Sequence, residues 1–413
     1  MLSRSRGATI LARSALRGIS PTTLVSKPLR AFLCCQQDLR LHSVPAYRFW
    51  ASIFRSALAE AGHVCLEAPG CDWAEGLLPR APEDHARWKQ LTWDRAFSWL
   101  VQEHRRKPVD LFLSYLYPGQ VEPSAVGQIR DLGIPCVNFF CDNVRLFRKI
   151  PDAFRAFDLN WVPEVRGCEL YERAGFPFLF APMPCWVERR FRSAPAAETL
   201  PTTFVGTRDE QRERLFSEAI RLGLSIDLRG TGWAGEPEAA EAALGRTGLS
   251  LLANQVRFIR SQGWGAFFRK ARNTVFPAVP IDFDFRPWVR ERCNPDSYWQ
   301  VLRESVVCVG VNRYPSLRYP ASRPDTYSRL RDLEGPMVGS AYVTEDAPEL
   351  ASLYDVGNEI EVYRNPAELV EKVKQLQRDP ARRRLMRRSA QRRALADHTI
   401  EKTLDKITSR LGL

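Results

Sequence analysis

The sequence predicts an α/β protein made of two tandem, doubly wound, Rossmann-like domains with a cleft between them. Short and almost continuously apolar strand patterns alternate with amphipathic helix patterns, as in parallel sheets that helices cover on both faces. The alternation starts again after a polar stretch near residue 190. The length of 413 residues also exceeds what a single hydrophobic core usually supports.

The first alternation, residues 28–190, is expected to form the N-terminal domain. It begins with the strand pattern LRAFLCC, and a helix pattern follows over 45–62, where Gly62 is a suitable C-terminal stop. The apolar face of that helix carries Trp50, Ile53, Phe54, Ala57, Leu58 and Ala61. Further strands are expected at HVCLEAP, VDLFLSYL, IPCVNFFCD, FDLNWVPE and FPFLFAPMP, and helices near 83–106, near 123–133 and at RGCELYERAG.

The second alternation, residues 202–395, predicts another domain of the same kind. Residues 191–201, polar and rich in small residues, are the expected linker. After a strand, a Gly-Thr turn, a helix and a second strand, an insertion over 234–296 interrupts a pattern that SYWQVLRES, VVCVGVN, APELASLYDVG and NEIEVYRN continue. The last segment, 396–413, predicts a helix that docks through Ile400, Leu404, Ile407 and Leu411.

The formal net charge of +12 indicates an anionic partner. Residues 378–393 contain eight arginines and one aspartate, and a solvated helix face is the usual explanation of such a run. Nucleic-acid binding through Arg383, Arg384, Arg387 and Arg388 is the alternative, and it would make binding sensitive to salt. The run has none of the interleaved aromatic residues on which bases stack, so no nucleic-acid partner is predicted.

The ends and the insertion bear on localisation. Residues 1–27 carry five basic residues and no acidic one, which fits a targeting segment or a disordered basic extension equally well. Ten cysteines without a CxxC pair are typical of reduced thiols and favour a cytoplasmic protein. The basic and aromatic stretch 254–277 predicts a helical insertion packed on the protein, with a peripheral membrane contact as the second interpretation.

Several catalytic motifs are missing from the sequence. It has no GxxxxGK[ST] loop, no HExxH, no zinc-type cysteine spacing and no GxSxG elbow, and only five histidines. The sequence therefore gives no support to the common ATPase and metallohydrolase activities, and no cofactor is predicted. What remains are polar and glycine-rich turns after strands, where open α/β sheets bind ligands.

Two strand ends and one helix offer candidate binding residues. In FVGTRDE, Gly206 and Thr207 lie where a strand meets a helix, so that free backbone N–H groups would favour phosphate, and Asn312 and Arg313 close another strand. PDTYSRLRDLEGPM predicts a helix capped by Asp325, with Arg331 and Glu334 three residues apart on one face. A local ion pair between these two is the simplest interpretation of that spacing.

In order, FVGTRDE, LRGTGW, YWQVLRES, VGVNR, RDLEGPMVGSAYVTED, LYDVGNEIEVY and DHT resemble the CgeB-like, spore-maturation type of glycosyltransferase, which is related to the group 1 enzymes with the GT-B fold. The positions that fall on the family's pattern are Arg331, Glu334, Gly339, Thr344, Gly357, Glu359, Ile360, His398 and Thr399. The resemblance covers 202–403 outside the insertion and is looser over 29–186.

This resemblance implies a metal-independent transfer of a sugar from a nucleotide diphosphate-sugar to an unknown acceptor, which could be a glycan, a protein or a small molecule. Glu334 would accept hydrogen bonds from hydroxyls of the donor, and Arg313, with Arg331, would stabilise the leaving diphosphate. Asp142 or His42 of the acceptor-side domain would act as base or acceptor contact. The implied donor-binding set is Gly206, Thr207, Arg208, Gly230, Gly232, Trp233, Asn312, Arg313, Arg331, Glu334, Gly339 and Thr344. The alternative is a non-catalytic sugar- or nucleotide-binding protein on the same scaffold.

Overall fold

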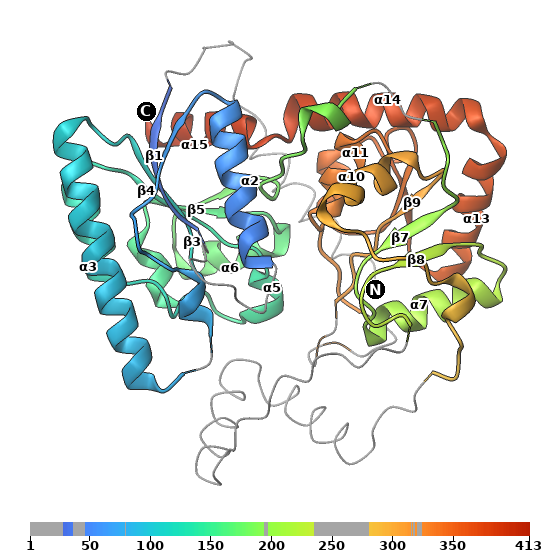
Figure 1. Ribbon diagram of the computed structural model, residues 1–413, viewed down its shortest axis with the longest axis horizontal. Coiled ribbons are helices and arrows are strands. Elements are labelled where there is room, and N and C mark those ends of the chain that lie inside the picture. The colour runs from blue at the N-terminus through green and yellow to red at the C-terminus, as the bar shows by residue number, and fades with distance from the viewer. Residues whose placement is uncertain are drawn as a thin grey trace, which may run out of the picture. The chain divides into compact units, whose positions relative to one another are not determined.

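The structure is a computed structural model that describes residues 28–35, 46–78, 80–193, 197–234, 281–314, 316, 319 and 324–413. Contacts divide these residues into two compact units (Figure 1). Unit 1 comprises the described residues up to Phe140, Asp152–Ala181 and Ile400–Leu413, and unit 2 comprises Cys141–Pro151 and the described residues from Pro182 to Thr399. The domain limits 28–190 and 202–395 remain predictions.

Unit 1 is built on a parallel six-stranded sheet with the order β2-β1-β3-β4-β5-β6. The strands are β1 Arg30–Cys35, β2 Val64–Leu66, β3 Leu111–Tyr115, β4 Cys136–Phe139, β5 Leu159–Val162 and β6 Phe178–Phe180. β1, β3, β4 and β5 are buried along their whole length, because their side chains are covered on both faces of the sheet. The continuous apolar patterns in the sequence predicted this arrangement.

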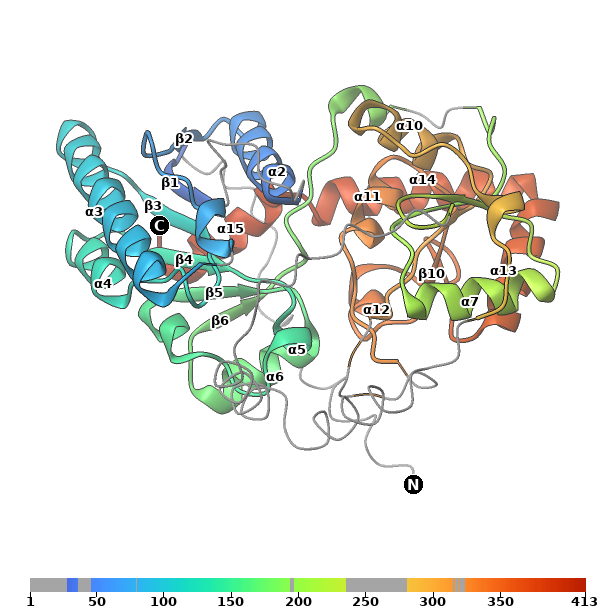
Figure 2. The ribbon, with the colours of Figure 1, turned by 60° about the horizontal axis from the view of Figure 1, so that its bottom comes forward.

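The helices of unit 1 pack on both faces of its sheet. They are α2 Ala46–Glu60, α3 Pro82–Arg106, α4 Pro123–Asp131, α6 Val165–Ala174 and α15 Ile400–Leu411, with single turns η1 Ala74–Leu77 and η2 Asp152–Ala156. Right-handed crossovers place α2 on one face and α3, α4 and α6 on the other. α3 contacts α4, and α15 contacts α2 (Figure 2). The predicted docking of the last segment is confirmed for Ile400, Leu404 and Ile407, which are buried, whereas Leu411 is only partly buried.

Unit 2 is built on a parallel five-stranded sheet with the order β11-β10-β9-β7-β8. Its strands are β7 Thr203–Val205, β8 Asp227–Arg229, β9 Cys308–Val309, β10 Tyr342–Glu345 and β11 Glu361–Tyr363. The chain moves from β7 outward to β8 and then returns to β9 on the other side of β7. The strand order therefore reverses between β7 and β9, and ligands of open α/β sheets bind at such a switch point, beyond the carboxyl ends of the strands.

The helices of unit 2 also cover both faces of the sheet. They are α7 Glu210–Arg221, α10 Pro295–Glu304, α11 Arg331–Met337, α12 Leu350–Leu353, α13 Pro366–Arg378 and α14 Pro380–Asp397, with single turns η3 Arg189–Phe191 and η4 Arg286–Trp288. The short helix α5 Asn143–Leu146, which follows β4 in the sequence, is also assigned to unit 2. α7 contacts α13, and α11 contacts α14 (Figure 1). The predicted fold class, two doubly wound parallel-sheet domains, is confirmed.

The arginine-rich run is only partly the solvated face that the sequence predicts. It forms α14, where Arg384 and Arg388 are exposed but Arg383 and Arg387 are only 5% and 1% exposed. Both buried arginines pair with Glu198, and Arg387 also donates to the backbone oxygens of Arg303 and Gly339. The prediction of a solvated face was wrong for these two residues, because backbone and carboxylate oxygens inside unit 2 accept their hydrogen bonds and neutralise their charge.

Candidate functional site

The turns after β7 and β8 lie side by side next to the switch point. The Gly206 amide donates to the Arg229 oxygen at 2.7 Å, and the hydroxyl groups of Thr207 and Thr231 are 2.9 Å apart. Gly230 has φ of +149°, and a Cβ there would lie 2.2 Å from the Gly206 oxygen. Only glycine fits at this position. The two turns lie together in the structure, and their contact with a donor remains a prediction.

The backbone amides that begin α7 are not free for an anion. Asp209 is the N-cap, and its Oδ1 accepts from the amides of Gln211 and Arg212 at 2.9 Å. The expectation of free N–H groups after Thr207 is therefore wrong for these two amides, because the carboxylate of the chain itself caps the helix.

Arg208 and Trp233 have partners within the fold. Arg208 pairs with Glu213 at 2.8 Å, and its guanidinium lies over the Phe285 ring. The Trp233 side chain is 1% exposed in the core of unit 2, and its indole N–H donates to the Gly206 oxygen at 2.7 Å. Gly232, beside Trp233, adopts φ of +82°. These contacts stabilise the turns, and the donor contacts of these residues remain predictions.

Asn312 and Arg313 follow β9 and bind to the end of β10. Arg313 donates from Nε to Glu345 Oε1 at 2.7 Å, and Glu345 Oε2 accepts from the Arg313 amide at 2.9 Å. The Asn312 side chain donates to the Glu345 backbone oxygen at 2.7 Å and to the Thr344 hydroxyl at 3.3 Å. Arg313 is thus neutralised by a buried carboxylate, which leaves less of its charge for a diphosphate.

The helix that carries Arg331 and Glu334 begins later than the sequence predicts. α11 spans Arg331–Met337, and Asp325 accepts a hydrogen bond from the Tyr314 hydroxyl at 2.7 Å instead of capping it. The buried carboxylate of Asp332 accepts from the Arg329 amide at 3.0 Å and thereby fixes the start of the helix. α11 ends at Met337, and Gly339, two residues later, adopts φ of +74°, as glycine commonly does just after a helix.

Arg331 and Glu334 do not form the expected ion pair, and both contact Tyr298 on α10. The Tyr298 hydroxyl donates to Glu334 Oε2 at 2.5 Å and accepts from Arg331 Nε at 3.2 Å. Arg331 forms no ion pair with any described residue. Glu334 is 3% exposed, and its Oε1 has no hydrogen-bond partner among the described residues. Burial raises the pKa of Glu334, and the charge of Arg331 opposes this.

A buried carboxylate oxygen without a partner is costly, because burial removes its hydration without replacing it. Such an oxygen is therefore well suited to accept a hydrogen bond from a ligand hydroxyl. Among the predicted site residues, this observation most directly indicates a binding function.

Arg331, which acts on Glu334, is one of three arginines that affect one another electrostatically, and the sequence analysis singled out only this one. Burial lowers the pKa of Arg212 on α7, Asp209 opposes this, and the positive charges of Arg329 and Arg331 lower the pKa further. Arg329 Nε is buried and has no hydrogen-bond partner among the described residues. We call Arg212, Arg329 and Arg331 the arginine cluster. It supplies the concentrated positive charge that a diphosphate requires.

Asp142 reaches the arginine cluster from the segment that follows β4. Its Oδ1 accepts a hydrogen bond from the Tyr327 hydroxyl, and the guanidinium of Arg329 lies 4.2 Å from the centre of the Tyr327 ring. Asp142 has φ of +68°, the only positive value for a residue other than glycine in the described chain. The strain indicates that packing in unit 2 holds this carboxylate in place. Its role as a base remains a prediction.

The remaining candidate residues either make contacts within the fold or lie outside the described residues. His398 contacts the Leu353 oxygen through Nε2 at 2.7 Å, and Glu359 pairs with Arg393 on α14. His42 and the stretch 254–277 lie outside the described residues, as does the extension 1–27.

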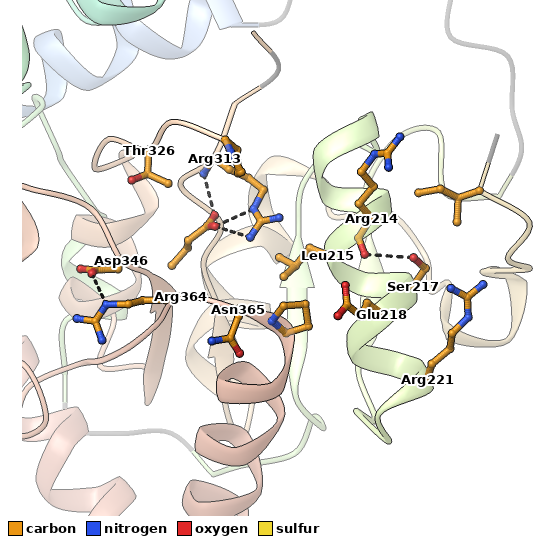
Figure 3. Close-up of a pocket in the computed structure, with 14 residues that line it drawn as sticks. Arg214, Leu215, Ser217, Glu218, Arg221, Arg313, Thr326, Asp346, Arg364 and Asn365 are labelled. Carbon is orange, nitrogen blue, oxygen red and sulfur yellow. Dashed lines mark hydrogen bonds and ion pairs between the residues drawn. The ribbon is translucent and has the colours of Figure 1, made fainter. Parts of the chain in front are cut away.

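A pocket of 860 Å³ opens beside the end of β10 (Figure 3). Arg214, Glu218 and Arg221 of α7 line one wall, and Arg313 and Arg364 line the other (Figure 3). Most of its charges are neutralised locally, for example by the ion pair of Arg364 with Asp346 at 2.9 Å. The arginine cluster and Glu334 do not line it, and their buried polar atoms without partners identify the better candidate site.

In the described part of the chain, no group of three or more His, Cys, Asp or Glu side chains is arranged to hold a metal ion. None of the described helices has the length and apolarity required to cross a membrane.

Comparison with known proteins identifies the fold. The model of a family described as glycosyl transferase-like matches residues 212–409. Among solved structures, sucrose-phosphate synthase from Thermosynechococcus elongatus is similar, with a TM-score of 0.55, 12% identity, and 93% of this chain and 99% of that chain covered. HepE from Anabaena in complex with UDP gives a TM-score of 0.52 at 10% identity, with 93% and 100% covered. The fold is GT-B.

A third GT-B structure leads to the same conclusion. AviGT4, a glycosyltransferase involved in avilamycin A biosynthesis, gives a TM-score of 0.51 at 14% identity, with 93% of this chain and 96% of that chain covered. A search of curated proteins finds no match. In the GT-B fold of this chain, Glu334 and the arginine cluster belong to unit 2, beyond the carboxyl ends of β7 and β9.

Proposed function

We propose that this protein is a glycosyltransferase of the CgeB-like type, which moves a sugar from a nucleotide diphosphate-sugar to an acceptor. The observation that carries the proposal is the buried Glu334 carboxylate at the switch point of a GT-B sheet, which has one oxygen without a described partner and lies beside Arg331 of the arginine cluster. This arrangement offers an acceptor for hydroxyl groups beside a site for negative charge.

The proposed site offers binding groups for two parts of the donor, the ribose and the diphosphate. Glu334 Oε1 accepts a hydrogen bond from a ribose hydroxyl and so fixes the orientation of the nucleotide. The arginine cluster binds the diphosphate and stabilises the charge that develops on it as the glycosidic bond breaks. Because the cluster supplies this charge, the proposed reaction needs no metal ion. Two structures of HepE, with UDP and with UDP-glucose, make uridine nucleotides the first ligands to test.

The test compares nucleotide binding by the wild type and two variants. UDP and UDP-glucose should bind and raise the melting temperature, since a ligand specific for the folded state stabilises it. Glu334→Ala should abolish this shift while retaining the circular dichroism of the wild type. Glu371→Ala, which removes an exposed carboxylate on α13, is the matched control and should bind normally. Failure of the wild type to bind UDP, ADP, GDP or their glucose conjugates would refute the proposal.

A non-catalytic binding protein is the second candidate. It is favoured by Asp142, whose carboxylate accepts from Tyr327 and also lies 3.8 Å from Arg145, so it is already engaged and is poorly placed to take a proton from an acceptor. A binding protein would retain the UDP-glucose affinity of the transferase but would release no UDP in the presence of glycan, protein or small-molecule acceptors. Measurement of UDP release by the wild type separates the two functions.

A further inference from the structure

Tyr298 connects the two functional side chains of α11 through one hydroxyl group. This hydroxyl donates to Glu334 Oε2 at 2.5 Å and accepts from Arg331 Nε at 3.2 Å. The Arg331 guanidinium also lies 5.5 Å from the centre of the Tyr298 ring. The tyrosine therefore orients the carboxylate and the guanidinium relative to each other.

The first turn of α10 holds this tyrosine in a defined place. Asn294 accepts from the Ser297 amide at 2.7 Å, and the Ser297 hydroxyl accepts from the Asn294 amide at 3.0 Å, which completes a capping box. The neighbouring Trp299 is buried, and its ring lies 4.8 Å from that of Tyr298. Because Tyr298 directly follows the capped turn, the backbone that carries its ring is held in place.

The geometry divides the work between the two oxygens of Glu334. The oxygen that accepts from Tyr298 cannot turn away, and the other oxygen remains without a partner in the described chain. Apart from Tyr298, the ionisable groups that act on Glu334 are Arg331 on α11, Cys308 on β9 and Cys185. Of these, Arg331 and the Tyr298 hydroxyl favour the charged carboxylate, while burial disfavours it.

We propose that Tyr298 is a positioning residue of the donor site, which holds the Glu334 carboxylate turned so that its free oxygen accepts a hydroxyl of the donor's ribose. The inference rests on the proposed function and adds a residue to it. Without the tyrosine hydroxyl, the carboxylate loses both a hydrogen bond and its fixed direction. Loss of the tyrosine hydroxyl should therefore weaken binding of the ribose hydroxyl more than binding of the diphosphate, which the arginine cluster provides.

Tyr298→Phe tests the proposal, because it removes the hydroxyl and keeps the ring under Arg331. UDP should bind the variant about tenfold more weakly than the wild type, as expected for the loss of one hydrogen bond to a charged group. 2′-Deoxy-UDP and 3′-deoxy-UDP should both lose less affinity for the variant than UDP does. As pH falls, UDP binding should begin to weaken at a higher pH in the variant than in the wild type. The reason is that Glu334 protonates more readily when it lacks the hydrogen bond from Tyr298.

Tyr342→Phe is the matched control. Tyr342 donates to Asp332 at 2.9 Å, so this change removes the same type of bond on the same helix without touching Glu334. It should leave the preference for UDP over the deoxy ligands and the pH dependence of binding unchanged. If Tyr298→Phe does not fold, Tyr298→His, which keeps a ring and an N–H donor, should fold and retain most of the preference for UDP.

The outcomes separate this inference from the proposed function. Normal UDP binding by Glu334→Ala would overturn the function itself. Loss of binding in Glu334→Ala, together with wild-type affinity, wild-type preference for UDP and wild-type pH dependence in Tyr298→Phe, would overturn the positioning role alone.

Discussion

Glu198 neutralises the two buried arginines of α14, and its replacement by glutamine tests this part of the structure. Its carboxylate accepts from Arg383 Nε at 3.0 Å and from Arg383 Nη2 at 2.5 Å, and Arg387 Nε lies 3.2 Å from its Oε1. The Glu198 side chain is 24% exposed. Glu198→Gln has nearly the same shape and removes only the charge, so any loss of stability reports on the two guanidinium groups left behind.

The expected loss follows from the burial of these groups. Removal of one partner from a buried ion pair typically destabilises a protein by about 3–5 kcal/mol. Because Glu198 is partly exposed and the glutamine oxygen still accepts one hydrogen bond, we expect about 2–3 kcal/mol here. In a domain of the size of unit 2, this corresponds to a fall in melting temperature of roughly 4–12 °C.

Thermal and urea unfolding, followed by circular dichroism, measure the effect. Partial burial raises the pKa of Glu198, but Arg383 and Arg387 outweigh it, so the pKa lies below its ordinary value. The charge of Glu198 therefore stabilises the protein fully above the ordinary pKa of about 4.3 and less as pH falls through the lowered value. The difference in stability between wild type and variant should be constant from pH 6 to 7 and should shrink below about pH 4.5.

Glu210→Gln is the matched control. It breaks an exposed ion pair with Arg214, in which the Glu210 side chain is 53% exposed, and should change stability by less than about 0.5 kcal/mol. Equal effects of the two substitutions, or a Glu198→Gln variant as stable as the wild type, would refute the assignment of a structural role to the buried arginines.

Three further predictions concern single side chains. Arg329→Ala should weaken UDP binding about tenfold or more and leave uridine binding unchanged in calorimetry, because it removes charge from the diphosphate site only. Gly230→Ala should destabilise unit 2 by roughly 2 kcal/mol or more in thermal unfolding, since its Cβ meets the Gly206 oxygen, whereas Gly223→Ala meets only a flexible lysine end and should cost less. Burial lowers the pKa of His63, whose Nδ1 accepts a backbone N–H, so unit 1 should lose stability from pH 7 to 5.5, and His63→Gln should remove that dependence.

The central strands of unit 1 were predictable because β1, β3, β4 and β5 are short apolar runs covered on both faces. β3 and β4 are buried along their whole length, and their sequences contain almost no polar residue to obscure the pattern. β9 was also found, although it comprises only Cys308 and Val309, because the surrounding VVCVGV is continuously apolar. A strand can be predicted from the sequence when the apolar pattern of its own residues matches their burial in the fold.

The start of α11 could not be predicted because a tertiary contact decides it. Asp325 is a suitable cap by local rules, but the segment after it pairs with Arg313, and the helix begins where Asp332 can accept bonds from Ser328, Tyr342 and Thr344. The partners on β10 are distant in sequence until the sheet forms. Local propensity was thus overruled by a buried network.

The arginine cluster was missed for a similar reason. Arg329 lies two residues before Arg331 in SRLRDLEG, so the sequence shows that the two are close along the chain. In a chain with many arginines, however, this spacing does not indicate a binding role for Arg329. Arg212 lies on α7, more than a hundred residues earlier. Their common position at the switch point follows from the strand order, which one sequence does not specify.

The route of the chain has a consequence for synthesis. α15 follows unit 2 in the sequence and is translated after it, yet its buried residues Ile400, Leu404 and Ile407 belong to the unit whose strands are made first. Until α15 has been translated, α2 lacks the helix that packs on it, and unit 2 can complete its own core sooner. The unit that is translated first therefore matures last, and a nascent chain stopped at Thr399 would carry an uncovered apolar surface on its N-terminal half.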